Sequence, residues 1–310
     1  MEGHAQLNSP LIECVPNFSE GRDLAVVDAL ESAVASVRGS FVLHRTSDPD
    51  HHRSVITFAG TPQSVVESAV RAAAIAAEHI DLTRQKGVHP RLGALDVLPF
   101  VPLEGASLGH CIELAHEAGQ RIWNELRIPV YFYEAAAFRP DRVRLEDVRR
   151  GEFEAFRTLG HEADAKRPDI GGPALHPTAG AVIAGARKLL VAFNINLKTT
   201  NLGIAKSIAR RIRASNGGFP AVKALGLPLA SRALVQVSTN LTDFEQSSPL
   251  TVYKEVEQLA AEAGVEIVES ELIGLIPRRA IENVNPGDLK LKDFTPERIL
   301  ENRLVSVATA

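Results

Sequence analysis

The 310-residue sequence has few cysteines, few aromatic residues and no long run of one charge. Its two cysteines, Cys14 and Cys111, are far apart and neither belongs to a C-x-x-C pair. This spacing argues against a zinc site or a disulfide framework and favours a reducing compartment. Acidic and basic residues alternate at a net charge of −4, without an aromatic-rich basic patch, so no nucleic acid partner is expected.

No uninterrupted apolar run approaches the length of a membrane span, so no membrane partner is expected either. The first residues lack a basic region followed by an apolar stretch, which argues against a signal peptide. Neither G-x-x-x-x-G-K-[ST] nor G-x-G-x-x-G occurs, so there is no support for ATP-dependent or dinucleotide-dependent chemistry. Together these absences favour a soluble cytoplasmic protein.

The chain is 45% hydrophobic and 23% charged, the balance of a globular protein with an ample core, and its length favours two lobes. A stretch rich in glycine and proline over 166–180 is the best boundary, which gives expected lobes of 1–180 and 181–310. The spacing of the apolar residues, with a helical period in some segments and strand-like runs in others, predicts the order β-α-β-β-α-β in both halves. The first half then adds a helix and a strand.

In the first half, strands are expected at 11–15, 40–43, 54–59, 94–101 and 130–133, and helices at 24–37, 62–80 and 108–126. In the second half, strands are expected at 188–195, 222–229, 233–241 and 265–272, and helices at 201–214 and 249–263. This order is typical of two ferredoxin-like lobes, each an antiparallel-rich sheet with helices on one face, so the predicted fold class is α+β. A single larger α/β sheet is the alternative.

The segment 85–101, QKGVHPRLGALDVLPFV, carries the most distinctive chemistry. Gly87 and Pro90 flank His89 and predict a loop, and Pro90 favours an extended backbone at His89. Arg91 follows, just before a buried strand. A histidine and an arginine at the start of such a strand suit a site that moves protons while it holds an anion. The structural alternatives are that His89 caps a turn and that Arg91 is a solvated surface charge.

KGVHPRLGALDVLPFVP resembles the KGEHPRMGALDV-PF-P signature of the glutamate formimidoyltransferases, or formiminotransferases. The resemblance extends from about residue 11 to 277 through LIECVPNFSEGRD, DPDHHRSVITFAG, PDIGGPALHPTAGAVIAGARKLLVAFNINL and VQVSTNLTDFEQSSPLTVYKEV. Several long segments in the right order make it specific. It implies a transferase without a cyclodeaminase domain, which acts in histidine degradation and is usually a homodimer.

The resemblance implies transfer of a formimino group from N-formimino-L-glutamate to tetrahydrofolate, which gives 5-formiminotetrahydrofolate and glutamate. A secondary amine of the folate attacks an amidine carbon, its proton is removed, and the departing glutamate nitrogen gains a proton. A histidine with a pKa near neutrality can perform both transfers, and His89 occupies the family's catalytic position. No metal is implied, and tetrahydrofolate is the only co-substrate.

The substrates carry several carboxylates, which arginine can bind with two parallel hydrogen bonds. The arginines in the matching segments are Arg53, Arg91 and Arg187. The matching glycine-rich loop contacts folate in the family, although by itself it would be interpreted as a linker between lobes. It consists of Gly171, Gly172, Pro173, Ala174, Leu175, His176, Pro177, Thr178, Ala179 and Gly180. Asn17 and Asn194 lie near strand ends, where their amides could orient a substrate or complete a turn.

Three positions depart from the family pattern: Val88 replaces a glutamate, His52 an asparagine, and His176 an apolar residue. His44, His51 and His52 lie near two aspartates, but adjacent histidines in a loop rarely bind one ion, and no helical H-x-x-x-H occurs, so no metal is expected. Two other functions stay open: a related enzyme that uses another one-carbon donor, such as 5-formyltetrahydrofolate, and a non-catalytic folate-binding protein.

Overall fold

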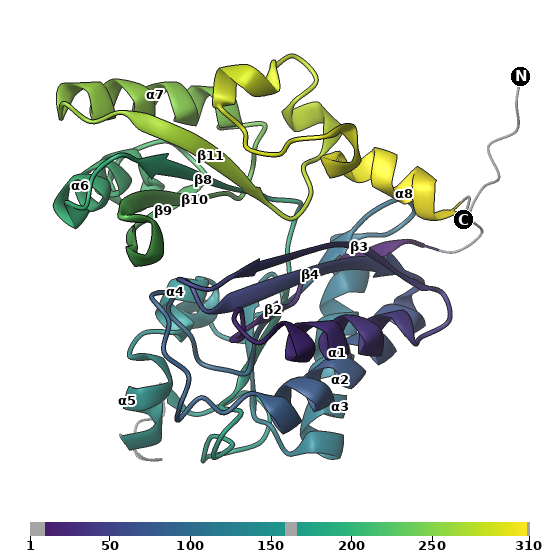
Figure 1. Ribbon diagram of the computed structural model, residues 1–310. Helices are drawn as coiled ribbons and strands as arrows, with labels where there is room; N and C mark the ends of the chain where they lie inside the picture. Colours follow the sequence, from purple (N-terminus) through teal and green to yellow (C-terminus); the bar gives the residue numbers. More distant parts are fainter. Residues whose placement is uncertain (1–9, 159–165, 309–310) are drawn as a thin grey trace, which may run out of the picture. The chain divides into compact units, whose positions relative to one another are not determined.

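The computed structural model describes residues 10–158 and 166–308 (Figure 1). The chain divides into two compact units, one that ends at Arg187 and one that begins at Lys188. Each unit has its own sheet and its own hydrophobic core. The structure is therefore mixed α and β with two sheets, and the alternative of one larger sheet is wrong.

The first unit contains a seven-stranded sheet. Its strands are β1 (Ile12–Cys14), β2 (Asn17–Phe18), β3 (Ser40–Asp48), β4 (Arg53–Gly60), β5 (Leu95–Pro102), β6 (Val130–Glu134) and β7 (Val182–Ala186). β1 and β2 both pair with β4 and β5, so they are two parts of one strand position. The order is then β3, β4, β1 with β2, β5, β7, β6. The described pairs are antiparallel except that β7 is parallel to β5 and β6.

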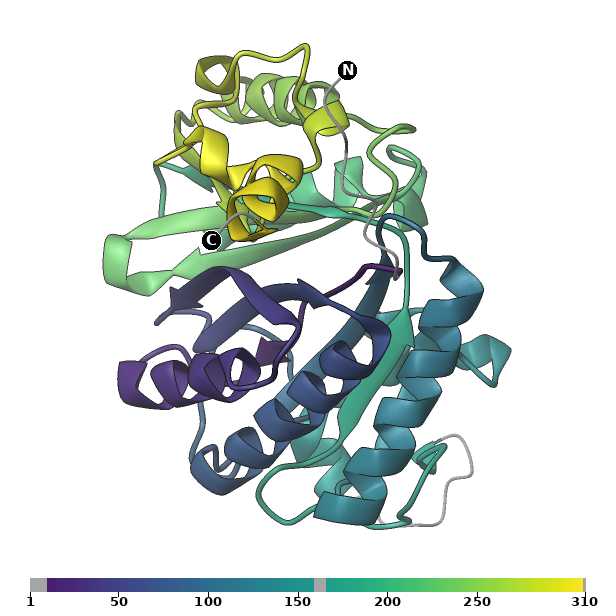
Figure 2. The same ribbon diagram turned by 90° about the vertical axis from the view of Figure 1, so that its right-hand side faces the viewer.

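Three helices with side-chain N-caps cover one face of this sheet, where Figure 2 shows them side by side. They are α1 (Leu24–Ala35), α2 (Pro62–His79) and α3 (Leu108–Leu126). Asp23 accepts the N–H of Ala25 at 3.0 Å, and Thr61 accepts the N–H of Ser64 at 3.4 Å. Such bonds satisfy donors that the first turn of a helix leaves unpaired.

The other face of the sheet is covered near β6 and β7. Successive strand residues point to opposite faces, so Phe132 joins the core under α3 whereas Tyr131 and Tyr133 join a second core with Val148. Val148 ends the short helix α4 (Leu145–Val148), which α5 (Glu152–Thr158) follows. The prediction of helices on one face only is wrong here, because parallel strands are usually buried on both faces.

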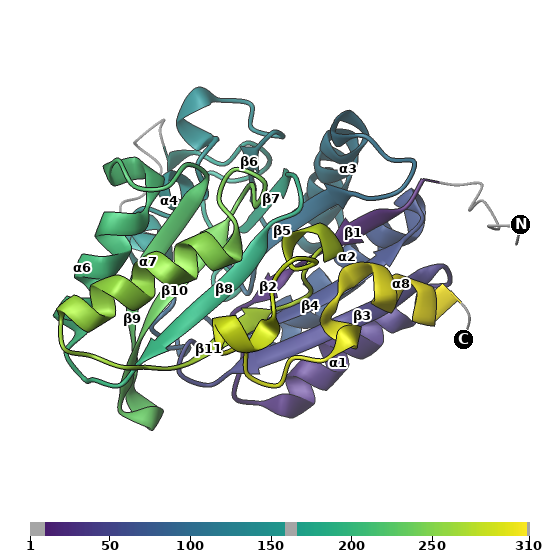
Figure 3. The same cartoon turned by 90° about the horizontal axis from the view of Figure 1, so that it is seen from above.

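The second unit contains a four-stranded antiparallel sheet in the order β11, β8, β10, β9 (Figure 3). Its elements are β8 (Val191–Leu197), α6 (Leu202–Ile212), β9 (Val222–Leu229), β10 (Leu234–Leu241), α7 (Pro249–Glu262), β11 (Ile267–Ile273) and, after several single 3₁₀ turns, α8 (Leu300–Ala308). The core of this unit contains Phe193, Ile195 and Val237 from the sheet. Ile208 from α6 and Val252 from α7 pack in the same core. The predicted order of elements is confirmed in this unit.

Two stretches of the first unit differ from the prediction. The polar stretch expected as a loop over 44–52 begins as strand, because β3 continues to Asp48 and pairs with β4 as far as Arg53. β7 was not predicted, because VIAGA is short and follows a glycine-rich loop. The first unit consequently continues past residue 180, and β7 pairs with β5 and β6.

Candidate active site

The segment that carries His89 connects α2 to β5 and is hydrogen-bonded to the loop between β3 and β4. The N–H of Val88 donates to the carbonyl of Asp50 at 3.3 Å, and the Gln85 amide donates to the carbonyl of His52 at 3.0 Å. Gly87 permits this approach, because a Cβ there would lie 2.3 Å from the carbonyl oxygen of His51. The two loops therefore form one structural unit around His89.

One ring nitrogen of His89 is already engaged. Its Nδ1 lies 2.9 Å from the carbonyl oxygen of Pro90, which can only accept a hydrogen bond, so Nδ1 carries the proton. Nε2 then keeps its lone pair. The pKa of His89 is lowered well below 6.5, first by desolvation of the half-buried ring and then by the charges of Arg53 and Arg149. Burial and the two arginines thus favour the neutral form of His89 in the unliganded site.

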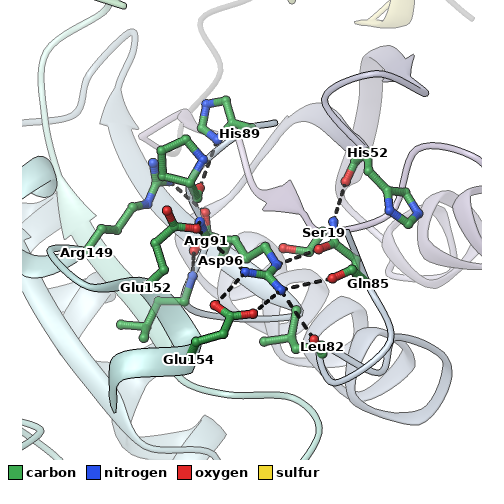
Figure 4. A network of polar contacts seen from close by, with 12 residues as sticks. Ser19, His52, Leu82, Gln85, His89, Arg91, Asp96, Arg149, Glu152 and Glu154 are labelled. Carbon is green, nitrogen blue, oxygen red and sulfur yellow. Dashed lines mark hydrogen bonds and ion pairs between the residues drawn. The ribbon is translucent and has the colours of Figure 1, made fainter. Parts of the chain in front are cut away.

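The two arginines that lower the pKa of His89 share one buried carboxylate, that of Asp96 on β5, which is 0% exposed. Figure 4 labels Arg149, Asp96 and His89. Its Oδ2 accepts from Arg53 Nη1 at 2.8 Å and from Arg149 Nη2 at 2.7 Å. Its Oδ1 accepts the backbone N–H groups of Leu92 at 2.8 Å and Gly93 at 3.3 Å. Burial alone would raise the pKa of Asp96, but the two arginines outweigh it and the pKa is lowered.

This group of three charges leaves an excess of one positive charge next to His89. Burial lowers the pKa of Arg53 to about 10, and Asp96 opposes the shift, so Arg53 stays charged at neutral pH. Arg149 is buried, and its Nε has no hydrogen-bond partner within the described part of the chain. A buried donor without a partner is costly, and an anion would satisfy it. The site can therefore bind a carboxylate beside a neutral base.

The sequence prediction included Arg53 but missed Asp96 and Arg149. Asp96 had a usable signal, because an ionisable residue inside the apolar strand LDVLPFVP must be paired when it is buried. Arg149 had none, since it lies in the charge-rich stretch LEDVRRGEFE beside Arg150, which is largely exposed. Only the packing of α4 against the sheet distinguishes these two arginines.

Arg91 is two residues from His89, but its guanidinium is engaged within the protein (Figure 4). Its Nε donates to Gln85 Oε1 at 2.5 Å, and its two Nη atoms donate to the Glu154 carboxylate at 2.8 and 3.0 Å. Nη2 also donates to the carbonyls of Gln85 at 2.9 Å and Leu82 at 3.3 Å. These contacts connect the His89 segment to α5.

The glycine-rich loop 171–180 is fixed to the same segment. The N–H of Leu82 donates to the carbonyl of Thr178, and the N–H of Ala94 donates to the carbonyl of Ala179, both at 2.9 Å. Gly180 has a positive φ, and a Cβ there would lie 2.0 Å from the carbonyl oxygen of Leu92. His176 Nδ1 accepts the N–H of Ala179 at 3.0 Å, so its Nε2 carries the proton. Burial lowers the pKa of His176.

The remaining predicted residues are Asn17, Arg187 and Asn194. Asn17 on β2 accepts from Arg53 Nε at 3.2 Å and donates to the carbonyl of Val15 at 2.8 Å, so it supports the arginine pair. Arg187 follows β7 and interacts with Tyr133, whose pKa burial raises to about 12. Asn194 is buried on β8 in the second unit.

His52 is hydrogen-bonded to the segment that carries His89. Its Nδ1 lies 3.1 Å from the carbonyl oxygen of Lys86 and its Nε2 lies 3.0 Å from Glu20 Oε1. Although burial opposes it, hydrogen bonding to His52 and to backbone N–H groups lowers the pKa of Glu20 to about 2.

Two absences among the described residues concern membrane spans and metal sites. None of the helices in these ranges is long and apolar enough to cross a membrane. Within residues 10–158 and 166–308, no group of three histidine, cysteine, aspartate or glutamate side chains is placed to hold a metal ion.

Comparisons with known proteins agree along nearly the whole chain. The family model "Formiminotransferase domain, N-terminal subdomain" matches residues 11–187, and "Formiminotransferase domain" matches residues 192–297. A protein named glutamate formimidoyltransferase from Streptococcus pyogenes is 43% identical over 95% of this chain and 99% of its own length. One of the same name from Thermoplasma acidophilum is 43% identical over 96% and 98%. The rat formimidoyltransferase-cyclodeaminase is 43% identical over 88% of this chain and 51% of its own length.

Proposed function

This chain belongs to the formiminotransferase family, and we propose that His89 moves the protons while the chain transfers a formimino group from N-formimino-L-glutamate to tetrahydrofolate. The observation that carries the proposal is the neutral His89 beside an arginine pair with an excess positive charge. The names of two relatives, each similar over nearly its full length, support the transferase activity and the donor.

The reaction requires a base when the folate amine attacks the amidine carbon. The free Nε2 of His89 suits this step, because the Nδ1 bond to Pro90 fixes the tautomer that leaves Nε2 unprotonated. The proton taken from the folate amine then passes to the glutamate nitrogen, and the bond between that nitrogen and the transferred carbon breaks. One proton is taken and one is returned, so the enzyme ends the cycle unchanged.

A substrate carboxylate would bind to Arg53 and Arg149. The charge of the bound carboxylate would offset the positive field that lowers the pKa of His89, so binding would make His89 a stronger base. Arginine suits this role because its planar guanidinium donates two parallel bonds to a carboxylate. Asp96 holds the two guanidinium groups in position and is itself too deeply buried to contact substrate.

The loop 171–180 is our proposed folate contact, together with Arg187, Asn17 and Asn194. Its bonds to the His89 segment would couple folate binding to the position of the base. Arg91 would act through those same bonds, since its donors are engaged within the protein. We further propose that the second unit is ferredoxin-like, that the first unit is a ferredoxin-like lobe extended by β6 and β7, and that the protein is a cytoplasmic homodimer that uses tetrahydrofolate and no metal.

The test measures glutamate release from N-formimino-L-glutamate with and without tetrahydrofolate, for the wild type, His89→Gln and the control His79→Gln, an exposed histidine that ends α2. Release should require folate, and His89→Gln should lower kcat by about 10²–10⁴-fold. Unchanged kcat in His89→Gln would overturn the assignment of the base. No release by a wild type that still binds tetrahydrofolate would favour another one-carbon donor.

A second comparison tests the carboxylate site with a matched pair of neighbouring residues. Arg149→Gln should raise the KM for formiminoglutamate about tenfold or more, since a hydrogen-bonded charge pair is lost. Arg150→Gln is the control, because Arg150 is largely exposed and contacts Asp147 on the surface. Equal KM values for the two variants would exclude Arg149 from substrate binding.

A further inference from the structure

The reaction requires two proton transfers at different nitrogens, whereas the site described so far offers one free ring nitrogen. His89 Nε2 would have to face the folate amine first and the glutamate nitrogen afterwards, because its Nδ1 stays bonded to Pro90. A second group that exchanges protons would remove the need for that movement.

His51 lies next to His89. The centroids of the two rings are 5.9 Å apart, and their planes are inclined by 38°. His51 is 8% exposed, and its Nε2 is buried without a hydrogen-bond partner within the described residues. Buried polar atoms are nearly always paired, and leaving one unpaired costs about 1–3 kcal/mol. A substrate atom that completes this bond would account for the unpaired nitrogen.

The backbone around His51 is held in place. Its N–H donates to Asp48 Oδ1 at 2.7 Å, and the carbonyls on either side, those of Asp50 and His52, accept from Val88 and Gln85. The His52 ring also hydrogen-bonds to the carbonyl of Lys86. These bonds dock the loop that carries His51 onto the segment that carries His89, so the proximity of the two rings is fixed by both loops.

We infer that His51 is a second catalytic residue, which donates the proton to the departing glutamate nitrogen while His89 accepts the proton from the folate amine. This inference rests on the proposed function. The folate nitrogen bonds to the formimino carbon and loses its proton to His89 Nε2. The bond between that carbon and the glutamate nitrogen breaks as protonated His51 gives up its proton. Proton exchange through water then returns the proton from His89 to His51.

Charged and titratable groups surround His51 on two sides, and any of them can contribute to its pH dependence. On its own loop these are Asp48, Asp50, His52 and Arg53. On the facing elements they are Glu20, Arg22 and His89, of which Arg22 donates to the carbonyl of Pro49 at 2.9 Å. The structural alternative is that His51 only packs against His89 and shields it from water.

The experiment compares His51→Gln and His51→Phe with the wild type and with the surface control His79→Gln, measuring kcat and both KM values between about pH 5.5 and 9.5. Phenylalanine keeps the ring packing and glutamine keeps a polar group, but neither transfers a proton. We expect both variants to lose about 10–100-fold in kcat, to keep their KM values within about threefold, and to lose the alkaline limb of the kcat profile that His51 contributes.

A kcat for His51→Phe within about twofold of the wild type would assign His51 to packing and overturn the inference. A loss of kcat with an unchanged alkaline limb would overturn it as well. A wild type without folate-dependent release would overturn the proposed function and this inference together. The last measurement needs no variant: ¹⁵N-histidine spectra of the wild type with tetrahydrofolate and L-glutamate should show a shifted His51 ring signal, and an unchanged signal would contradict contact with substrate.

Discussion

Replacing Asp96 by asparagine should destabilise the first unit more than any loss of a surface charge. Asparagine keeps the shape and can still accept the N–H groups of Leu92 and Gly93. Its amide group, however, can only donate toward Arg53 and Arg149, which are also donors. Two buried guanidinium groups would then lack their shared counter-charge.

The expected loss follows from that geometry. Breaking a buried ion pair by removing one partner costs about 3–5 kcal/mol, and Asp96, at 0% exposure, has two such partners. Asp28→Asn is the matched control: Asp28 pairs with Arg45 on the surface, where a pair contributes about 0–1 kcal/mol. The free energy of unfolding is measured by urea denaturation followed by circular dichroism, for both variants and the wild type.

The same variant has a kinetic consequence. Without the Asp96 carboxylate the field of the two arginines at His89 becomes stronger, so the pKa of His89 should fall further. At neutral pH the variant would then be a weaker base and have a lower kcat, even where it is fully folded. A loss of less than about 1 kcal/mol, or a destabilisation equal to that of Asp28→Asn, would refute the assignment of Asp96 as the shared counter-charge.

Three further predictions concern the loops around His89. Because the arginines lower the pKa of His89 in the free enzyme and a bound carboxylate offsets them, the acid limb of kcat/KM should lie at a lower pH than that of kcat; identical limbs would contradict the carboxylate site. The pKa of Glu20 falls from its ordinary value of 4.5 to about 2 in the folded protein. Ionised Glu20 therefore contributes fully to the stability of the fold above about pH 4.5, and this contribution is lost as the pH falls through 2. Glu20→Gln should therefore lower the free energy of unfolding at pH 7 by at most about 3 kcal/mol and flatten its decline between those pH values in urea titrations. Gly87→Ala should lower the free energy of unfolding by about 1–3 kcal/mol and reduce kcat, because its Cβ would meet the carbonyl of His51. Gly217→Ala is the control, because its Cβ would meet no atom within 4 Å and only backbone strain would lower the stability. Equal effects of the two variants on kcat would contradict the docking of the two loops.

The sequence predicts most of the elements of this fold because their apolar periods are regular. The long helices α1, α2, α3, α6 and α7 and the strands of the second unit lie within a few residues of their expected ranges. β7 escaped prediction because VIAGA is equally compatible with a buried strand and with a loop continuation. Its place between β5 and β6 depends on pairing partners more than 40 residues away, which a local pattern does not contain.

The site shows the same division between local and non-local information. The resemblance identified His89 and Arg53, whose positions depend on short motifs. Arg91 was also predicted to hold an anion, because it lies two residues from His89 at the start of a buried strand. The direction of the side chain does not follow from that position. The guanidinium of Arg91 is surrounded by the carbonyl oxygens of Leu82 and Gln85, the amide oxygen of Gln85 and the carboxylate of Glu154. Proximity along a chain does not determine which side of a loop a side chain takes.

The departure at residue 88 has a physical consequence for the same base. Where the family pattern has a glutamate, this chain has Val88, so no carboxylate there can raise the pKa of His89. The carboxylate that does lie nearby, that of Asp96, is shared between two arginines and leaves a net positive field. We therefore expect a substrate carboxylate that binds Arg53 and Arg149 to raise the pKa of His89 and to make it a stronger base.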